Sequence, residues 1–112
     1  MIIGRNEALD LFRKWLDDGA TIRCQGSFPI FAFSFRAQVV GLSSGEVRFM
    51  SMDTHTEFVW KVAGGIRFDY ADSRSVTGQE AIDYECCLVV LFGEVPAERP
   101  ADTLAFAEIR KR

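Results

Sequence analysis

Residues 28–42, FPIFAFSFRAQVVGL, decide the fold of this chain. In a β-strand, residues two apart share one face. One face of this stretch is apolar and consists of Phe31, Phe33, Phe35, Ala37 and Val39. The opposite face is mixed and carries Ser34, Arg36, Gln38 and Val40. This alternation predicts a half-buried strand, in which each buried Phe contributes roughly 1.5–3 kcal/mol relative to exposure.

Length and composition are those of an ordinary globular protein. The 112 residues suffice for one domain with its own core, so we assign residues 1–112 to a single domain. Hydrophobic residues make up 48% and charged residues 26%, which argues against disorder. The net charge of −3 argues against a nucleic-acid binder, although it leaves room for a local basic patch.

No segment of the sequence points to a membrane or to export. No apolar run approaches the roughly 20 residues of a transmembrane helix. The start, MIIGRNEALDLF, lacks the basic and long apolar regions of a signal peptide. We therefore expect a cytoplasmic protein without a membrane partner.

The three cysteines are Cys24, Cys86 and Cys87. We interpret them as reduced thiols that serve as small apolar residues. Metal sites usually need closely spaced Cys or His pairs, and this sequence has no CxxC motif and a single His. We expect neither a metal nor a cofactor.

Residues 7–18 show the spacing of an amphipathic helix. Asn6 is a suitable N-cap, and Gly19 suits the position after the last turn. The polar face mixes acidic and basic side chains, whereas helices that lie on membranes are usually rich in Lys and Arg. The pattern therefore predicts a lid on a β core.

Three hairpin loops set the expected strand register. They are residues 43–45, 53–56 and 63–65. Apolar residues must share a face, because a slip of one residue turns them outward. With these loops, Val39 pairs with Phe49, Phe49 with Trp60, and Trp60 with Phe68, all on the inner face.

The remaining segments complete an α+β, mainly β fold. Residues 21–25 are predicted to form a short strand, followed by a turn or a bulge at 26–27. Residues 84–92 are apolar on both faces, which indicates a central or barrel-closing strand. Residues 103–110 suit a helix or a strand, and we favour a strand paired with 84–92. We expect an N-terminal amphipathic helix followed by a six- or seven-stranded antiparallel meander, forming a small barrel or a strongly bent sheet.

The sequence carries no catalytic signature. It has no nucleophile elbow, P-loop or dinucleotide fingerprint. Asp53, His55 and Glu57 are two apart, but His55 lies in the expected 53–56 loop, where Asp and Thr commonly form local hydrogen bonds, so turn chemistry is favoured over metal binding. A triad of His55 with Ser51 or a cysteine stays open. The pattern favours a protein that is not an enzyme.

The expected outer face contains two candidate sites. Four apolar side chains lie there among charges, namely Val40, Met50, Met52 and Val59. Such a face indicates cover by the helix or by another chain, a second copy in the self-association hypothesis. The alternative is that these are single exposed apolar residues, which are normal on a protein surface. Three cations from neighbouring strands align on it, namely Arg48, Lys61 and Arg67. A solvated face on which these long side chains splay apart is the favoured interpretation. The alternatives are neutralisation by internal carboxylates and an anion-binding site.

Three function classes follow from these sites. The first is a non-enzymatic interaction or scaffold protein that self-associates as a homo-oligomer. The second is a binding module for an anionic ligand or nucleic acid. The third is an enzyme with a dispersed, motif-free site, since sites can be built on any fold.

Overall fold

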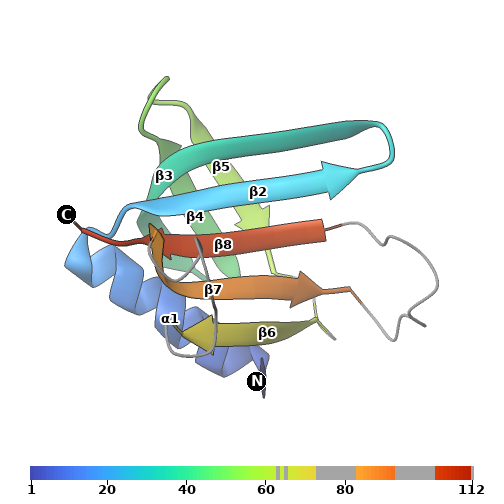
Figure 1. Ribbon diagram of the computed structural model, residues 1–112. Coiled ribbons are helices and arrows are strands. Elements are labelled where there is room, and N and C mark those ends of the chain that lie inside the picture. The colour runs from blue at the N-terminus through green and yellow to red at the C-terminus, as the bar shows by residue number, and fades with distance from the viewer. Residues whose placement is uncertain (63, 65, 73–82, 93–102, 112) are drawn as a thin grey trace.

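A computed structural model describes residues 1–62, 64, 66–72, 83–92 and 103–111. It consists of one helix and one antiparallel sheet of eight strands, in the order β1-β6-β7-β8-β2-β3-β4-β5 (Figure 1). The elements are β1 (Ile2–Ile3), α1 (Arg5–Asp18), β2 (Ile22–Phe28), β3 (Phe31–Ser43), β4 (Glu46–Ser51), β5 (Glu57–Lys61), β6 (Arg67–Asp72), β7 (Tyr84–Leu91) and β8 (Thr103–Ile109). The mainly β fold with an N-terminal helix is confirmed.

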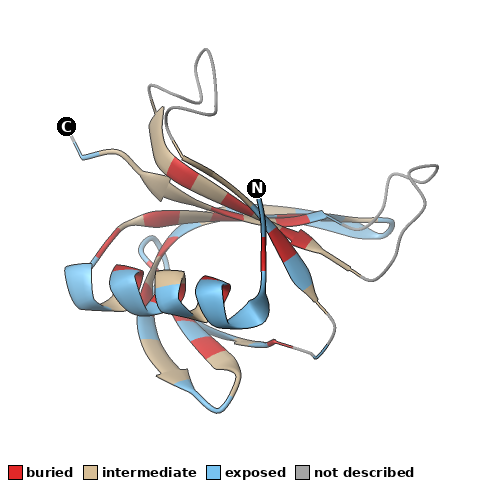
Figure 2. Ribbon diagram, turned by 90° about the horizontal axis from the view of Figure 1, so that it is seen from below, coloured by how far each residue is buried: buried red, intermediate tan, exposed pale blue. Residues whose placement is uncertain are grey.

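The strand order differs from the single meander expected. β2–β5 form one meander and β6–β8 form a second, and they join where β8 pairs with β2. The two-residue β1 adds an eighth strand beside β6. β1 and β5 stand at the two ends of the order, so the described sheet is bent but not closed into a barrel (Figure 2).

α1 covers one end of the concave face of this sheet (Figure 2). Its buried side chains are Ala8, Phe12 and Trp15, so the helix is the expected lid on the β core. It ends at Gly19, in the left-handed conformation (φ 60°), as expected. It begins earlier than expected, because Gly4 and not Asn6 is the N-cap. The Gly4 N–H donates to the Glu7 carboxylate at 3.5 Å.

The β3–β4 hairpin has the expected register except beside its turn. Val39 pairs with Phe49 as predicted. The loop has two residues instead of three, since Ser44 (φ 36°) and Gly45 (φ 80°) form a tight turn with both φ values positive. A bulge between Val39 and Gly41 takes up the extra residue and brings Leu42 back to the inner face.

The expected pair of Phe49 with Trp60 is wrong by two residues. Phe49 pairs with Phe58, and Trp60 pairs with Val47. The four-residue loop occupies residues 52–55, because the Ser51 N–H donates to the Thr56 carbonyl oxygen at 2.9 Å. A shift of two residues preserves the face of every side chain, so Trp60 still points inward.

The expected ladder pair of Trp60 with Phe68 is also wrong. β6 pairs with β1 and β7, and β5 lies at the other end of the strand order. The two rings instead meet edge to face across the interior, with centroids 6.1 Å apart. Residues 63 and 65 of the expected loop lie outside the described residues.

The turn before the long strand lies further along the chain than expected. β2 continues to Phe28, and the turn is Pro29-Ile30, where the missing N–H of proline costs no ladder bond. Gly26 remains in the strand, opposite Phe33. A Cβ on residue 26 would overlap the Phe33 ring, so only glycine allows this close approach.

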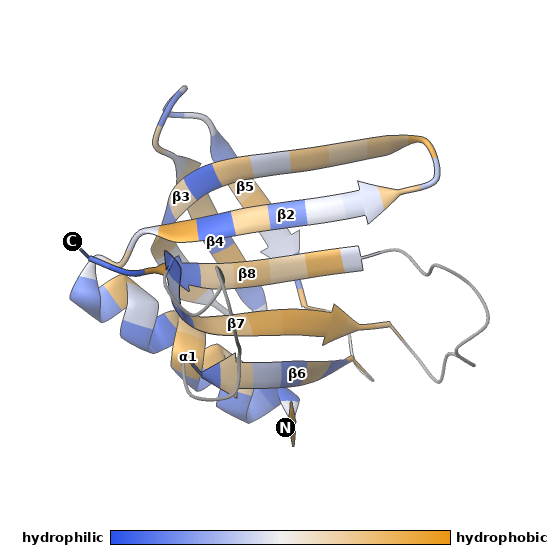
Figure 3. Cartoon of the chain, in the orientation of Figure 1, coloured by the Kyte–Doolittle hydropathy of each residue, from blue (hydrophilic) through white to orange (hydrophobic). Residues whose placement is uncertain are grey.

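The C-terminal strands agree with the sequence pattern. After Glu85, β7 is apolar, and it lies between β6 and β8 as a central strand should (Figure 3). Residues 103–109 form a strand, and this strand pairs with β7 as favoured. It also pairs with β2, a contact that the sequence did not indicate.

Candidate functional site

The end of the concave face that α1 leaves open forms an apolar groove. Its volume is about 620 Å³. It is lined by Cys24, Phe28, Phe31, Phe33, Phe35, Phe49, Phe58, Val59, Trp60, Phe92, Leu104 and Phe106. This set contains eight of the ten phenylalanines of the chain and no charged side chain. We call it the aromatic groove.

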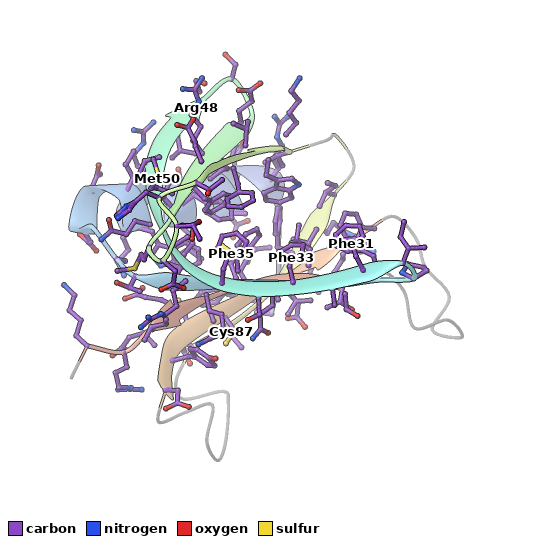
Figure 4. The ribbon with its side chains drawn as sticks, turned by 90° about the horizontal axis from the view of Figure 1, so that it is seen from above. Phe31, Phe33, Phe35, Arg48, Met50 and Cys87 are labelled. Atoms are coloured by element: carbon purple, nitrogen blue, oxygen red, sulfur yellow. The ribbon has the colours of Figure 1, made fainter. Side chains whose placement is uncertain are left out.

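The phenylalanines of β3 lie in this groove and not in the core. Phe31, Phe33 and Phe35 share one face of the strand as predicted (Figure 4). Phe31 is 55% exposed, however, and the other two are only half-buried. A helix of 14 residues is only about 21 Å long, whereas a strand of 13 residues spans about 43 Å. Because α1 cannot cover the whole strand, the expected burial is wrong for Phe31 and only partly met by Phe33 and Phe35, which pack against the core.

The rings form a continuous row along the groove. Phe28 stacks on Phe31 with centroids 5.0 Å apart, at the tip of the β2–β3 hairpin. Phe33 and Phe35 follow at 5.7 Å, and Phe35 stacks on Phe58 of β5 at 4.7 Å. The row offers several ring faces side by side, which suits a flat or extended apolar molecule.

The other end of the concave face is polar. The Trp15 indole N–H donates to Glu108 Oε1 at 2.8 Å, and the Cys86 thiol lies 3.9 Å from the same oxygen. Burial, and then the Glu108 carboxylate, raise the pKa of Cys86 to about 11. Burial and Cys86 also raise the pKa of Tyr70. Cys86 is therefore a neutral thiol near pH 7 and a poor nucleophile.

The buried thiols predict a loss of stability in alkaline solution. Burial raises the pKa of Cys24 to about 12, above the ordinary value of 9.0. Between about pH 9 and 11 the unfolded chain releases thiol protons that the folded chain keeps, so folding weakens as pH rises. We expect Cys24→Ala/Cys86→Ala to show a smaller decline than the wild type in urea denaturation at pH 8 to 10.5. Parallel declines would contradict the raised pKa values.

The three predicted anion-binding cations do not form a row. Arg48 lies opposite Val59, and Lys61 lies opposite Glu46. Arg67 is on β6, in the other half of the sheet. The predicted register is wrong here because the 52–55 loop shifts β5 by two residues and β6 does not pair with β5. Anion binding by these side chains stays a prediction, but the aligned row of three cations on which it was based does not form.

A different arginine cluster lies on the convex face. A hollow of about 430 Å³ is lined by Arg23, Arg36, Asp83, Tyr84, Ile109 and Arg110. Arg23 lies directly opposite Arg36 on the sheet. Carboxylates already pair with two of the arginines, since Arg36 lies 3.4 Å from Asp53 and Arg110 lies 3.3 Å from Glu85. A β2–β3 turn predicted at Pro29-Ile30 would have placed Arg23 opposite Arg36 from the sequence alone.

The predicted interface residues lie on the surface. Val40, Met52 and Val59 are exposed, and Met50 is half-buried on β4 beside Glu57. α1 does not cover them, because its apolar face packs into the concave core. Self-association through these four side chains stays a prediction.

The described residues contain no group of three or more His, Cys, Asp or Glu side chains arranged to hold a metal ion. His55 lies in the 52–55 loop in the left-handed conformation (φ 54°). In the same part of the chain, no helix is both long and apolar enough to cross a bilayer. Comparison with protein-family models, curated proteins and solved structures gives no match.

Proposed function

We propose that this chain is a non-enzymatic binding protein that holds an uncharged hydrocarbon portion of a ligand in the aromatic groove. The observation that carries this proposal is an open hollow of about 620 Å³, and no residue of the described chain that lines it has a charged side chain. Ligand pockets commonly measure roughly 300–1,000 Å³ and are mostly apolar.

The exposed rings supply the driving force. Phe31 and Phe58 are 55% and 42% exposed, and half-buried rings join them into one apolar surface. Burying a Phe side chain fully stabilises by roughly 1.5–3 kcal/mol. A ligand of about 20 non-hydrogen atoms at about 0.3 kcal/mol each would gain about 6 kcal/mol. That corresponds to a Kd in the tens of micromolar.

The lining also selects the ligand class. Among the described residues that line the groove, none has a charged or amide side chain, so a polar group placed deep in the groove would lose its hydration without compensation. The polar end of a ligand must therefore remain at the open mouth, in water. A single acyl chain with its headgroup outward satisfies both conditions.

Titration with palmitate, below the concentration at which it forms micelles, tests the proposal. Trp60 lines the groove and reports binding by fluorescence, whereas Trp15 is fully buried in the core. We expect saturable binding, weakened at least tenfold in Phe33→Gln. Ser34→Gln, on the opposite face of the same strand, is the matched control and should bind like the wild type. Absence of binding by the wild type, or equal affinity in both variants, would refute the proposal.

The other two function classes have weaker support. An anionic ligand would have to displace Asp53 and Glu85 from the convex arginine cluster. Salt-dependent binding of a polyanion to the wild type would favour that class. An enzyme that used Cys86 would need a thiolate, and burial keeps this thiol protonated near neutral pH.

A further inference from the structure

The free edge of β5 has its backbone groups ready for another strand. The Thr56 carbonyl oxygen and the Val62 N–H bond toward the β4 side, at 2.9 Å to Ser51 and 2.7 Å to Gly45. Backbone direction alternates along a strand, so Glu57, Val59 and Lys61 point their N–H and C=O groups away from β4. β5 ends the strand order, and no other strand of the described residues pairs with it.

The sequence of this edge is complementary to itself. In an antiparallel pair of two β5 strands centred on Val59, each Val59 meets its own copy and each Glu57 meets a Lys61. All three residues carry outward backbone groups, so each pair exchanges two hydrogen bonds. Opposite charges directly across an antiparallel pair are stabilising. A parallel alignment would instead set Glu57 against Glu57 and is disfavoured.

We propose that two copies of this chain pair antiparallel through β5, with a twofold axis at Val59, and form one continuous sheet. A twofold axis requires the same patch on both copies, and the EFVWK edge satisfies this requirement. Exposed apolar edges are usually protected by charges that repel another strand. Here the two end charges have opposite signs, so they admit a reversed copy of the same strand.

The same pairing joins the two aromatic grooves. Phe58 of one copy lies opposite Trp60 of the second copy, and both side chains face the groove side. Val59 borders the groove at the strand edge, but its side chain alternates with those of Phe58 and Trp60, points to the other face and is covered at the axis; the residue is 49% exposed. Aromatic cross-strand pairs add to the stability of such a contact. The dimer thus covers apolar side chains of β5 on both faces of the sheet.

Charge reversal tests the register of the dimer. Sedimentation velocity over a concentration series should show a reversible dimer for the wild type. Glu57→Lys and Lys61→Glu each place like charges across both outer pairs, and each should raise the dimer dissociation constant at least tenfold. An equimolar mixture of the two variants restores opposite charges in both outer pairs, so it should form a heterodimer with wild-type affinity.

Val59→Pro supplies a second test. Proline at position 59 lacks the N–H that points outward at the centre of β5, so it cannot donate to a second copy. It leaves the hydrogen bonds between β5 and β4 unchanged. We expect a folded monomer by circular dichroism and sedimentation. A monomeric wild type at high concentration would overturn the proposal. Dimerisation of Val59→Pro, or failure of the mixed charge variants to associate, would equally overturn this register.

Discussion

Phe12→Ala is expected to lower the free energy of unfolding by about 3–5 kcal/mol, the usual cost of truncating a fully buried aromatic side chain. Phe12 has no exposed surface, and its ring meets Trp15, Phe49, Trp60 and Phe106 with centroids 5.2–6.1 Å apart. These contacts join α1 to strands from both meanders. Urea denaturation measures the loss, which is a large fraction of the roughly 5–15 kcal/mol that a typical domain has.

Phe31→Ala is the matched control, because it makes the same chemical change at an exposed position instead of a buried one. Phe31 is 55% exposed at the mouth of the groove, so its truncation should cost less than about 1 kcal/mol. A cost at Phe31 equal to that at Phe12 would mean that the groove rings are part of the core. It would also remove the main reason to regard the groove as a binding surface.

The alternation of apolar and polar residues correctly predicted which side chains face the interior of the sheet. It predicted poorly which residues pair across neighbouring strands. Phe49, Trp60 and Phe68 all point inward, as their spacing indicates. Their partners depend on where each loop begins, and a four-residue loop at 52–55 or at 53–56 leaves every face unchanged. Both placements put the same apolar side chains on the inner face, so the two-residue error could not be detected from the pattern.

The groove was missed because burial depends on what packs against a face. The spacing of Phe31, Phe33 and Phe35 suits a core strand and a groove wall equally well. The available signal was the length of the two elements. A helix of 14 residues is about 21 Å long, so it cannot cover a strand of 13 residues, which spans about 43 Å. The pairing of β8 with β2 joins residues more than 70 positions apart, and no local pattern specifies it.

The contact between Trp15 and Glu108 should contribute more to stability than an ordinary surface hydrogen bond. The indole N–H donates to the carboxylate at 2.8 Å and ties α1 to β8, 93 residues away in the chain. A hydrogen bond to a charged group contributes about 1.5–3 kcal/mol. Trp15→Phe keeps an aromatic ring but removes the donor, and we expect a loss of unfolding free energy of at least this size.

The same substitution in a Glu108→Met background separates the hydrogen bond from ring packing. Removing one partner leaves a half-buried carboxylate without this donor, whereas removing both partners can be nearly neutral. Trp15→Phe should therefore cost at least about 1 kcal/mol less in the Glu108→Met chain than in the wild type. Both differences follow from urea denaturation at pH 7. Equal costs in the two backgrounds would show that Trp15 stabilises the fold by packing alone.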